Sequence, residues 1–101
     1  MMLNAYTVYD NKALAYNVPF FTSTDGQAVR MFADLANDSN TAVGRHPSDY
    51  SLFFIGSYDD QKGQLLAESP LRHVADAFAM LKIQPNLFDP AVDVSQLRRN
   101  A

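Results

Sequence analysis

The chain of 101 residues contains no cysteine. Disulfides, zinc–thiolate sites, iron–sulfur clusters and thiol catalysis are therefore excluded. No apolar run approaches the roughly 20 residues that a membrane-spanning helix requires. The N-terminal residues start directly with a strand-like pattern and no basic segment, so we expect no signal peptide and a soluble protein.

Positive charge is also scarce. The chain has eleven acidic and eight basic residues, and a formal net charge of −3. The first 81 residues carry nine acidic and five basic side chains, whereas the last 20 carry two acidic and three basic ones. Strong non-specific binding of nucleic acid depends on an extended positive field, which this composition does not provide.

Residue patterns typical of catalysis or metal binding are missing as well. The two histidines, His46 and His73, do not form the HxxxH or HExxH spacing of a metal site. Asp59 and Asp60 are adjacent, and side chains of adjacent strand residues point to opposite faces. His73 and Asp76 have the spacing of a solvated ion pair on a helix edge. We therefore expect a non-enzymatic protein with no metal and no cofactor.

Residues 50–66 predict a hairpin at the centre of the fold. Residues 52–55 are apolar in succession, which is typical of a strand buried on both faces. Residues 59–63 form a polar cluster that ends in glycine, as in a hairpin loop of three to five residues. Residues 64–67 would return as the partner strand.

The N-terminal part predicts two strands and a helix. Residues 3–9 and 13–21 are rich in β-branched and aromatic residues. Pro19 lacks an amide hydrogen, which favours an edge position or a bulge for the second strand. Thr24 has the spacing of a capping box, and the apolar periodicity after it predicts a helix over residues 25–37.

A second helix is predicted after the hairpin. Residues 41–49 are predicted to be an irregular connection that leads into the hairpin. After the hairpin, Ser69 and Pro70 have the residue types of an N-cap and a first helical position. The apolar stripe of this helix would consist of Leu71, Val74, Ala75, Phe78 and Leu81. The predicted fold is α+β, ββα–ββα: a four-stranded, mostly antiparallel sheet with two helices on one face. Residues 1–82 would form a single domain, and residues 83–101 an extended or partly disordered C-terminal tail.

The aromatic residues of the strands give the one candidate binding surface. Aromatic rings on an open sheet face, interleaved with basic side chains, can stack single-stranded bases. The candidate nucleic-acid-binding residues are Tyr6, Tyr9, Lys12, Tyr16, Arg30 and Arg45. The alternatives are that these rings belong to the core, or that the open face is a homodimer interface. The strand pattern admits either register for Tyr6 and Tyr16.

Several short runs together resemble a known family over about residues 3–80. They are YTVYD at 6–10, PFF at 19–21, AVR and FA within 28–33, PSDYSLF at 47–53, and IGSYDD at 55–60 followed by Gly63. In this order they resemble the small nonstructural protein of microviruses, the gokushovirus-type single-stranded-DNA phages (Microviridae).

The resemblance implies a protein made in the cytoplasm of the infected bacterium and absent from the virion. The family is described as DNA-binding or as assisting viral single-stranded DNA synthesis, and it brings no catalytic residues. One hypothesis is a replication or packaging accessory that binds single-stranded DNA weakly. The other is a protein–protein adaptor, a homodimer that binds a viral replication or assembly protein or a host factor.

Overall fold

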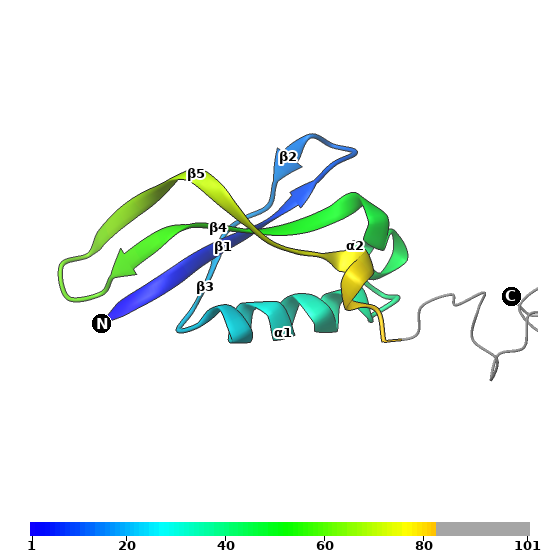
Figure 1. Cartoon of the computed structure of the whole chain (residues 1–101), viewed down its shortest axis with the longest axis horizontal. Coiled ribbons are helices and arrows are strands. Elements are labelled where there is room, and N and C mark those ends of the chain that lie inside the picture. Colours follow the sequence, from blue (N-terminus) through cyan, green and yellow to red (C-terminus); the bar gives the residue numbers. More distant parts are fainter. Residues whose placement is uncertain (83–101) are drawn as a thin grey trace, which may run out of the picture.

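The computed structural model describes residues 1–82, and the predicted tail at residues 83–101 lies outside the described part. The described chain folds into an antiparallel sheet with one long helix beneath it (Figure 1). Its elements are, in order, β1 (Met2–Asp10), β2 (Ala15–Tyr16), β3 (Phe20–Thr22), α1 (Asp25–Ala36), α2 (Ala42–Arg45), the 3₁₀ helix η1 (Pro47–Asp49), β4 (Tyr50–Asp59), β5 (Gln64–Asp76) and the 3₁₀ helix η2 (Ala77–Met80). No helix within residues 1–82 is long and apolar enough to span a bilayer.

The strands are arranged in the order β2–β1–β4–β5, and β3 also pairs with β1. The predicted central hairpin is confirmed: β4 and β5 pair from Asp59 and Gln64 onward, and Gly63 in the connecting turn has a φ of 62°. The predicted strand over residues 13–21 is interrupted, and β2 and β3 flank Pro19 at one edge of the sheet. The edge position agrees with the missing amide hydrogen of proline.

Helix α1 confirms the predicted helix over 25–37, and it begins where the sequence places its cap. The Thr24 hydroxyl accepts a hydrogen bond from the Gln27 amide at 3.2 Å, and the Gln27 side chain accepts one from the Ser23 amide at 2.9 Å. Its buried residues recur every four positions and pack against buried residues of β1 and β4, so this face of the sheet carries the core. The core residues of α1, β1 and β4 are Ala28, Phe32, Ala36, Tyr6, Val8 and Leu52.

The predicted second helix is wrong. Residues 64–76 form one continuous edge strand, β5, and only Ala77–Met80 turn into a 3₁₀ helix. Val74 and Ala75 are adjacent in β5, yet both contact the core, because the pairing of β5 is irregular at this point. Leu52 pairs with Ala75 and Phe53 with His73, which leaves Val74 as an extra residue. A bulge of this kind shifts the alternation of the strand by one position.

The predicted ββα–ββα plan with two helices on one face is therefore corrected. Strand accounts for 45% of the described residues and helix of all kinds for 28%, and the sheet curls like a half-barrel. One helix of 12 residues covers the sheet, since α2 has four residues. An apolar stripe predicts both helices, but only the first one forms. At the second, adjacent apolar residues of a bulged edge strand resemble part of a helical stripe.

Gly56 sits at the bend of the central strand. Ala5 pairs with Gly56 and Tyr6 with Phe54, so Ile55 is an extra residue in β4. A methyl group on Gly56 would lie 2.2 Å from the carbonyl oxygen of Leu66 on β5. The two strands approach closely at this point because residue 56 has no side chain.

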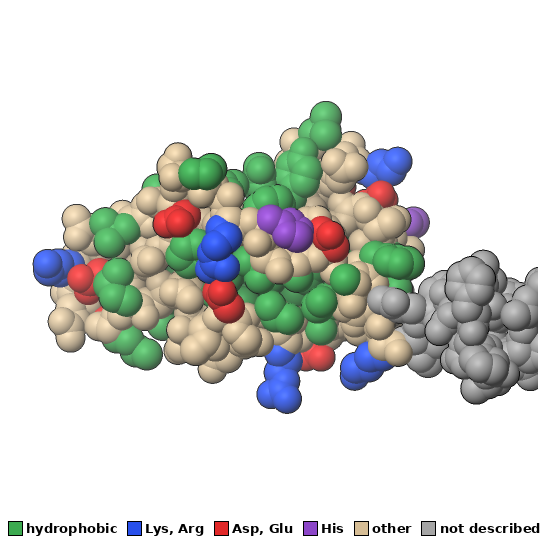
Figure 2. Space-filling view, viewed as in Figure 1, with side chains coloured by type: hydrophobic (Ala, Val, Ile, Leu, Met, Phe, Trp, Pro, Cys, Tyr) green, Lys and Arg blue, Asp and Glu red, His purple; other side chains and the backbone are tan. Residues whose placement is uncertain are grey.

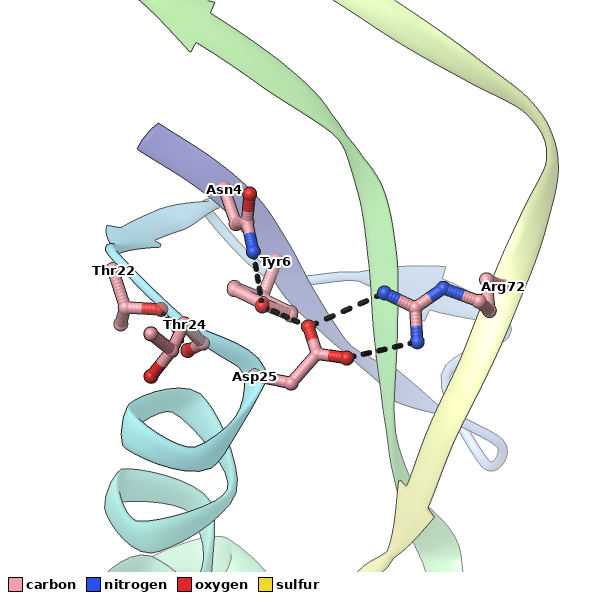
Figure 3. A network of polar contacts seen from close by, with 6 residues as sticks. All are labelled: Asn4, Tyr6, Thr22, Thr24, Asp25 and Arg72. Carbon is pink, nitrogen blue, oxygen red and sulfur yellow. Dashed lines mark hydrogen bonds and ion pairs between the residues drawn. The ribbon is translucent and has the colours of Figure 1, made fainter. Parts of the chain in front are cut away.

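One polar network connects the helix to β1 and to the edge strand β5 (Figure 3). Tyr6 of β1 is fully buried, and its hydroxyl donates to the Asp25 carboxylate and accepts from Asn4 Nδ2 at 3.0 Å. Arg72 of β5 binds both carboxylate oxygens of Asp25, at 3.2 Å and 3.0 Å. The Arg72 guanidinium also lies 4.6 Å from the ring centre of Phe54. Asp25 therefore joins the first turn of α1 to β1 and to the edge strand.

We predict that Tyr6→Phe lowers the free energy of unfolding by about 1–2 kcal/mol, because the buried hydroxyl bonds a carboxylate. The measurement is urea-induced unfolding followed by circular dichroism. Tyr58→Phe is the matched control: Tyr58 is half-buried and packs on Phe21 at 5.8 Å between ring centres. Equal effects of the two substitutions would contradict the role of the Tyr6 hydroxyl.

A second prediction concerns pH. Hydrogen bonds from Arg72, and then from Tyr6, lower the pKa of Asp25. A lowered folded-state pKa stabilises the fold above the unfolded value of about 3.9, and this stabilisation is lost as the pH falls through the folded value. We expect Asp25→Asn to cost stability at pH 6, and the difference from wild type to shrink below about pH 4. In an Arg72→Gln background the same substitution should show a weaker pH dependence, and an unchanged one would contradict the assignment.

Candidate functional site

Four rings gather on the sheet face that α1 does not cover. We call Tyr9, Tyr16, Phe53 and His73 the aromatic cluster. Each comes from a different strand of the order β2–β1–β4–β5, at positions that the register places side by side. Thr7 pairs with Phe53 and Tyr9 with Tyr16, so the odd-numbered residues of β1 face away from the helix. The cluster therefore crosses the whole width of the sheet.

The rings of the aromatic cluster are in direct contact. The ring centres of Tyr9 and Tyr16 lie 4.6 Å apart, and Phe53 lies 6.4 Å from Tyr9 and 6.1 Å from Tyr16. The His73 ring packs edge-on to Phe53 at 5.5 Å. Tyr16 is 52% exposed and the His73 side chain 51% exposed. Two accessible rings thus flank Phe53, which stands nearly perpendicular to both.

The structure brings three of the six sequence-predicted residues together. Tyr9 and Tyr16 belong to the aromatic cluster, and Lys12 lies in the turn between their strands. Lys12 is exposed, and its amide donates to the Asp10 carboxylate at 2.9 Å.

The other three predicted residues lie elsewhere. Tyr6 points to the opposite face, where it is fully buried beside Phe20 and Phe54. Arg30 is exposed on α1, which covers that opposite face. Arg45 ends α2. Neither arginine comes from a strand of the aromatic cluster.

Two polar side chains, Ser51 of β4 and Asp76 of β5, adjoin the cluster next to His73. The Ser51 hydroxyl donates to Asp76 Oδ1 at 2.7 Å, and His73 Nε2 lies 2.8 Å from the same oxygen. The Ser51 hydrogen bond and then the His73 hydrogen bond lower the pKa of Asp76. Residues three apart in a regular strand point to opposite faces, and the extra residue Val74 brings His73 and Asp76 to the same one.

The order of these contacts is not that of a nucleophilic triad. A nucleophilic serine needs a base that accepts its proton and a third group that orients the base. Here Ser51 donates to the carboxylate of Asp76, and His73 contacts the same oxygen. Among residues 1–82, no three His, Asp or Glu side chains are grouped so that they could hold a metal ion.

A cleft of about 340 Å³ opens beside Asp76. Tyr9, Phe53 and Asp76 contribute to its wall, together with Asn11, Phe78 and the segment from Pro47 to Ser51. Its lining contains two aspartates, Asp49 and Asp76, and no lysine or arginine. On the molecular face in Figure 2, the basic side chains are scattered singly rather than gathered into a patch.

A second hollow, of about 220 Å³, lies towards the hairpin end of the sheet, which extends beyond α1 (Figure 1). Leu65 and Leu66 of β5 line it and are 67% and 47% exposed. We call this hollow the apolar groove. Its complete lining is Ala5, Pro19, Phe21, Ile55, Leu65, Leu66 and Ala67.

Comparison with known proteins gives the family. The profile of the family described as "Phage ORF5 protein" matches residues 3–80. The chain belongs to the Phage ORF5 family. This confirms the resemblance to the small protein of gokushovirus-type microviruses.

A curated relative in the Phage ORF5 family is "Protein ORF5" of Chlamydia phage 1, a gokushovirus. It is 33% identical to this chain over 63 residues, which cover 58% of the chain and 66% of the relative. The aligned part thus spans just under two thirds of the relative's length. No solved structure matches the chain.

Sequence reasoning missed Phe53, His73 and Asp76 as members of this site. Phe53 lies in a continuous apolar run, which carries no information about the face that each residue occupies. The face of Phe53 follows from the alternation of side chains once β1 and β4 are paired. Phe53 then lies opposite Thr7, and Ser51 opposite Tyr9, on the same face of the sheet. The sequence pattern predicts a helix at His73 and Asp76, and only the bulge at Val74 brings both side chains to the face of the cluster.

Proposed function

We propose that this member of the Phage ORF5 family is a non-enzymatic accessory protein of the infected bacterium's cytoplasm, absent from the virion. It assists viral single-stranded DNA replication or packaging by binding single-stranded DNA weakly through the aromatic cluster. The observation that carries the proposal is the set of four contacting rings on the uncovered sheet face. Aromatic rings on such a face stack bases with little dependence on sequence.

Electrostatics sets the expected strength of this binding. Lys12 is the basic residue in the turn next to Tyr9 and Tyr16, whereas Arg72 is engaged by Asp25 on the helix side. Phosphate contacts supply most of the affinity of non-specific DNA binding. With one lysine beside the rings, stacking must contribute most of the free energy of binding. Weak binding with a shallow salt dependence follows.

A second candidate function is a protein–protein adaptor that forms a homodimer. The apolar groove favours it, because exposed leucines on a strand outside the helix-covered core are typical of an association surface. β5 is also the edge strand, and residues 64–73 are exposed along it. Pro70, Glu68 and Arg72 interrupt this edge with a proline and charges, which oppose strand addition there. The uncharged stretch 64–67 beside the groove has no such protection.

The first test is fluorescence anisotropy of a labelled mixed-sequence single-stranded 20-mer across a salt series, with duplex DNA for comparison. We expect micromolar binding that prefers single strands. Tyr16→Ala should weaken it about fivefold to a hundredfold, the range expected when one stacked base is lost. Lys12→Ala should lower the salt slope by about 0.7, the value for one phosphate on a single strand.

Arg30→Ala is the matched control for Lys12→Ala, because Arg30 lies on α1 behind the sheet. It should leave the affinity and the salt slope unchanged. Absence of binding at low salt, or equal effects of the two basic substitutions, would reject the aromatic cluster as the DNA-binding surface.

The adaptor function is tested by sedimentation velocity over a range of protein concentrations. We expect a salt-insensitive dimer, and Leu65→Ser should raise its dissociation constant at least about fivefold if Leu65 is a central contact. Leu14→Ser is the matched control, since Leu14 is 73% exposed and does not line the groove. A monomer at every concentration would exclude the homodimer.

A further inference from the structure

The cleft beside the aromatic cluster offers hydrogen-bond acceptors rather than cations. Ser51 and His73 both contact Oδ1 of Asp76, so neither contact uses Oδ2. The Asp76 side chain is 59% exposed. A carboxylate has about four acceptor positions on its two oxygens. Asp76 is therefore held in place at one oxygen and remains accessible to a further donor.

The ring of Phe53 and the carboxylate of Asp76 line the same cleft. Its volume of about 340 Å³ is at the small end of the range of ligand clefts, about 300–1,000 Å³. The two aspartates in its wall, without a lysine or arginine, make it unfavourable for a phosphate group. A flat, uncharged group with donors on its edge suits both the ring and the carboxylate.

We propose that this cleft binds a guanine base of single-stranded DNA, with Asp76 accepting hydrogen bonds from the guanine Watson–Crick edge. This inference rests on the proposed DNA-binding function. Guanine presents two adjacent donors on that edge, N1–H and the N2 amino group, which can converge on Oδ2, the oxygen that the Ser51 and His73 contacts leave free. The base stacks against the side of the aromatic cluster formed by Tyr9 and Phe53.

The other bases fit a carboxylate less well. Adenine and cytosine present one amino donor next to a ring-nitrogen acceptor. Thymine presents a single N–H between two carbonyl oxygens, which a carboxylate repels. Asp76 can only accept while ionised, as an aspartate is at neutral pH, and the hydrogen bonds of Ser51 and His73 lower its pKa further. The site therefore ranks guanine first and thymine last.

The test compares labelled thymidine 15-mers that carry one central guanine, hypoxanthine or thymine. Hypoxanthine is guanine without the N2 amino group, so it probes one hydrogen bond with no change in the protein. We expect the guanine strand to bind about tenfold more tightly than the all-thymine strand, as for hydrogen bonds to a charged acceptor, with hypoxanthine between them.

Two variants test whether Asp76 causes the preference for the guanine strand. Asp76→Asn should abolish the affinity ratio between the guanine and thymine strands, because the amide group that replaces Oδ2 donates hydrogen bonds and cannot accept them. Asp34→Asn, which changes an exposed carboxylate on α1, should retain the wild-type ratio. Circular dichroism verifies that both variants are folded.

The possible results separate this inference from the proposed function. No binding of any strand overturns both. Binding with equal affinity for the three strands, or a guanine preference that persists in Asp76→Asn, overturns the guanine site alone. If the strands show no preference and a glycine–arginine peptide binds wild type but not Asp76→Asn, the cleft is a site for a basic protein segment instead.

Discussion

The arrangement of this small fold depends on the contact of Asp25 with Tyr6 and Arg72. Asp25 occupies the first turn of α1, where a carboxylate is favoured by the helix dipole. Its partners belong to β1, which pairs along the centre of the sheet, and to β5, its far edge. Half-exposed ion pairs contribute little to stability by themselves. Here the contact of Asp25 with Tyr6 fixes the position of the helix. Tyr6 is buried, so its hydroxyl cannot bond to water in place of Asp25.

The position of the helix decides which face of the sheet is free. Asn4, Tyr6 and Val8 of β1 are directed to α1, so Thr7 and Tyr9 must face away from it. The same alternation on β4 sends Leu52 and Phe54 to the core and Ser51 and Phe53 to the open face. The aromatic cluster is therefore a consequence of where the core lies. Its rings could not be moved to the other face without a register shift that would expose the core.

Local signals in the sequence were sufficient for α1 and the central hairpin, since a capped apolar stripe and a polar loop ending in glycine are encoded within a few residues. They failed for β5. Val74 and Ala75 both contact the core because Val74 is an extra residue opposite β4, and such a bulge is determined by the partner strand. The faces of Tyr6 and Tyr16 were undecided for a related reason. Alternation places residues on two faces, but only the contact with α1 shows which face is buried.

Two of the irregularities in the strand pairing bear on the mixture of groups on the open face. Ile55 interrupts the alternation of β4 beside Gly56, and Val74 interrupts that of β5 beside His73. Without the second bulge, Asp76 would point to the helix side of the sheet, where burial of a carboxylate without a hydrogen-bond partner would be costly. With it, an acceptor fixed by Ser51 and His73 stands next to exposed rings. An acidic chain that binds DNA must rely on the bases rather than the phosphates. Rings beside a carboxylate are suited to that form of recognition, because they address the faces and the donor edges of bases and require little positive charge.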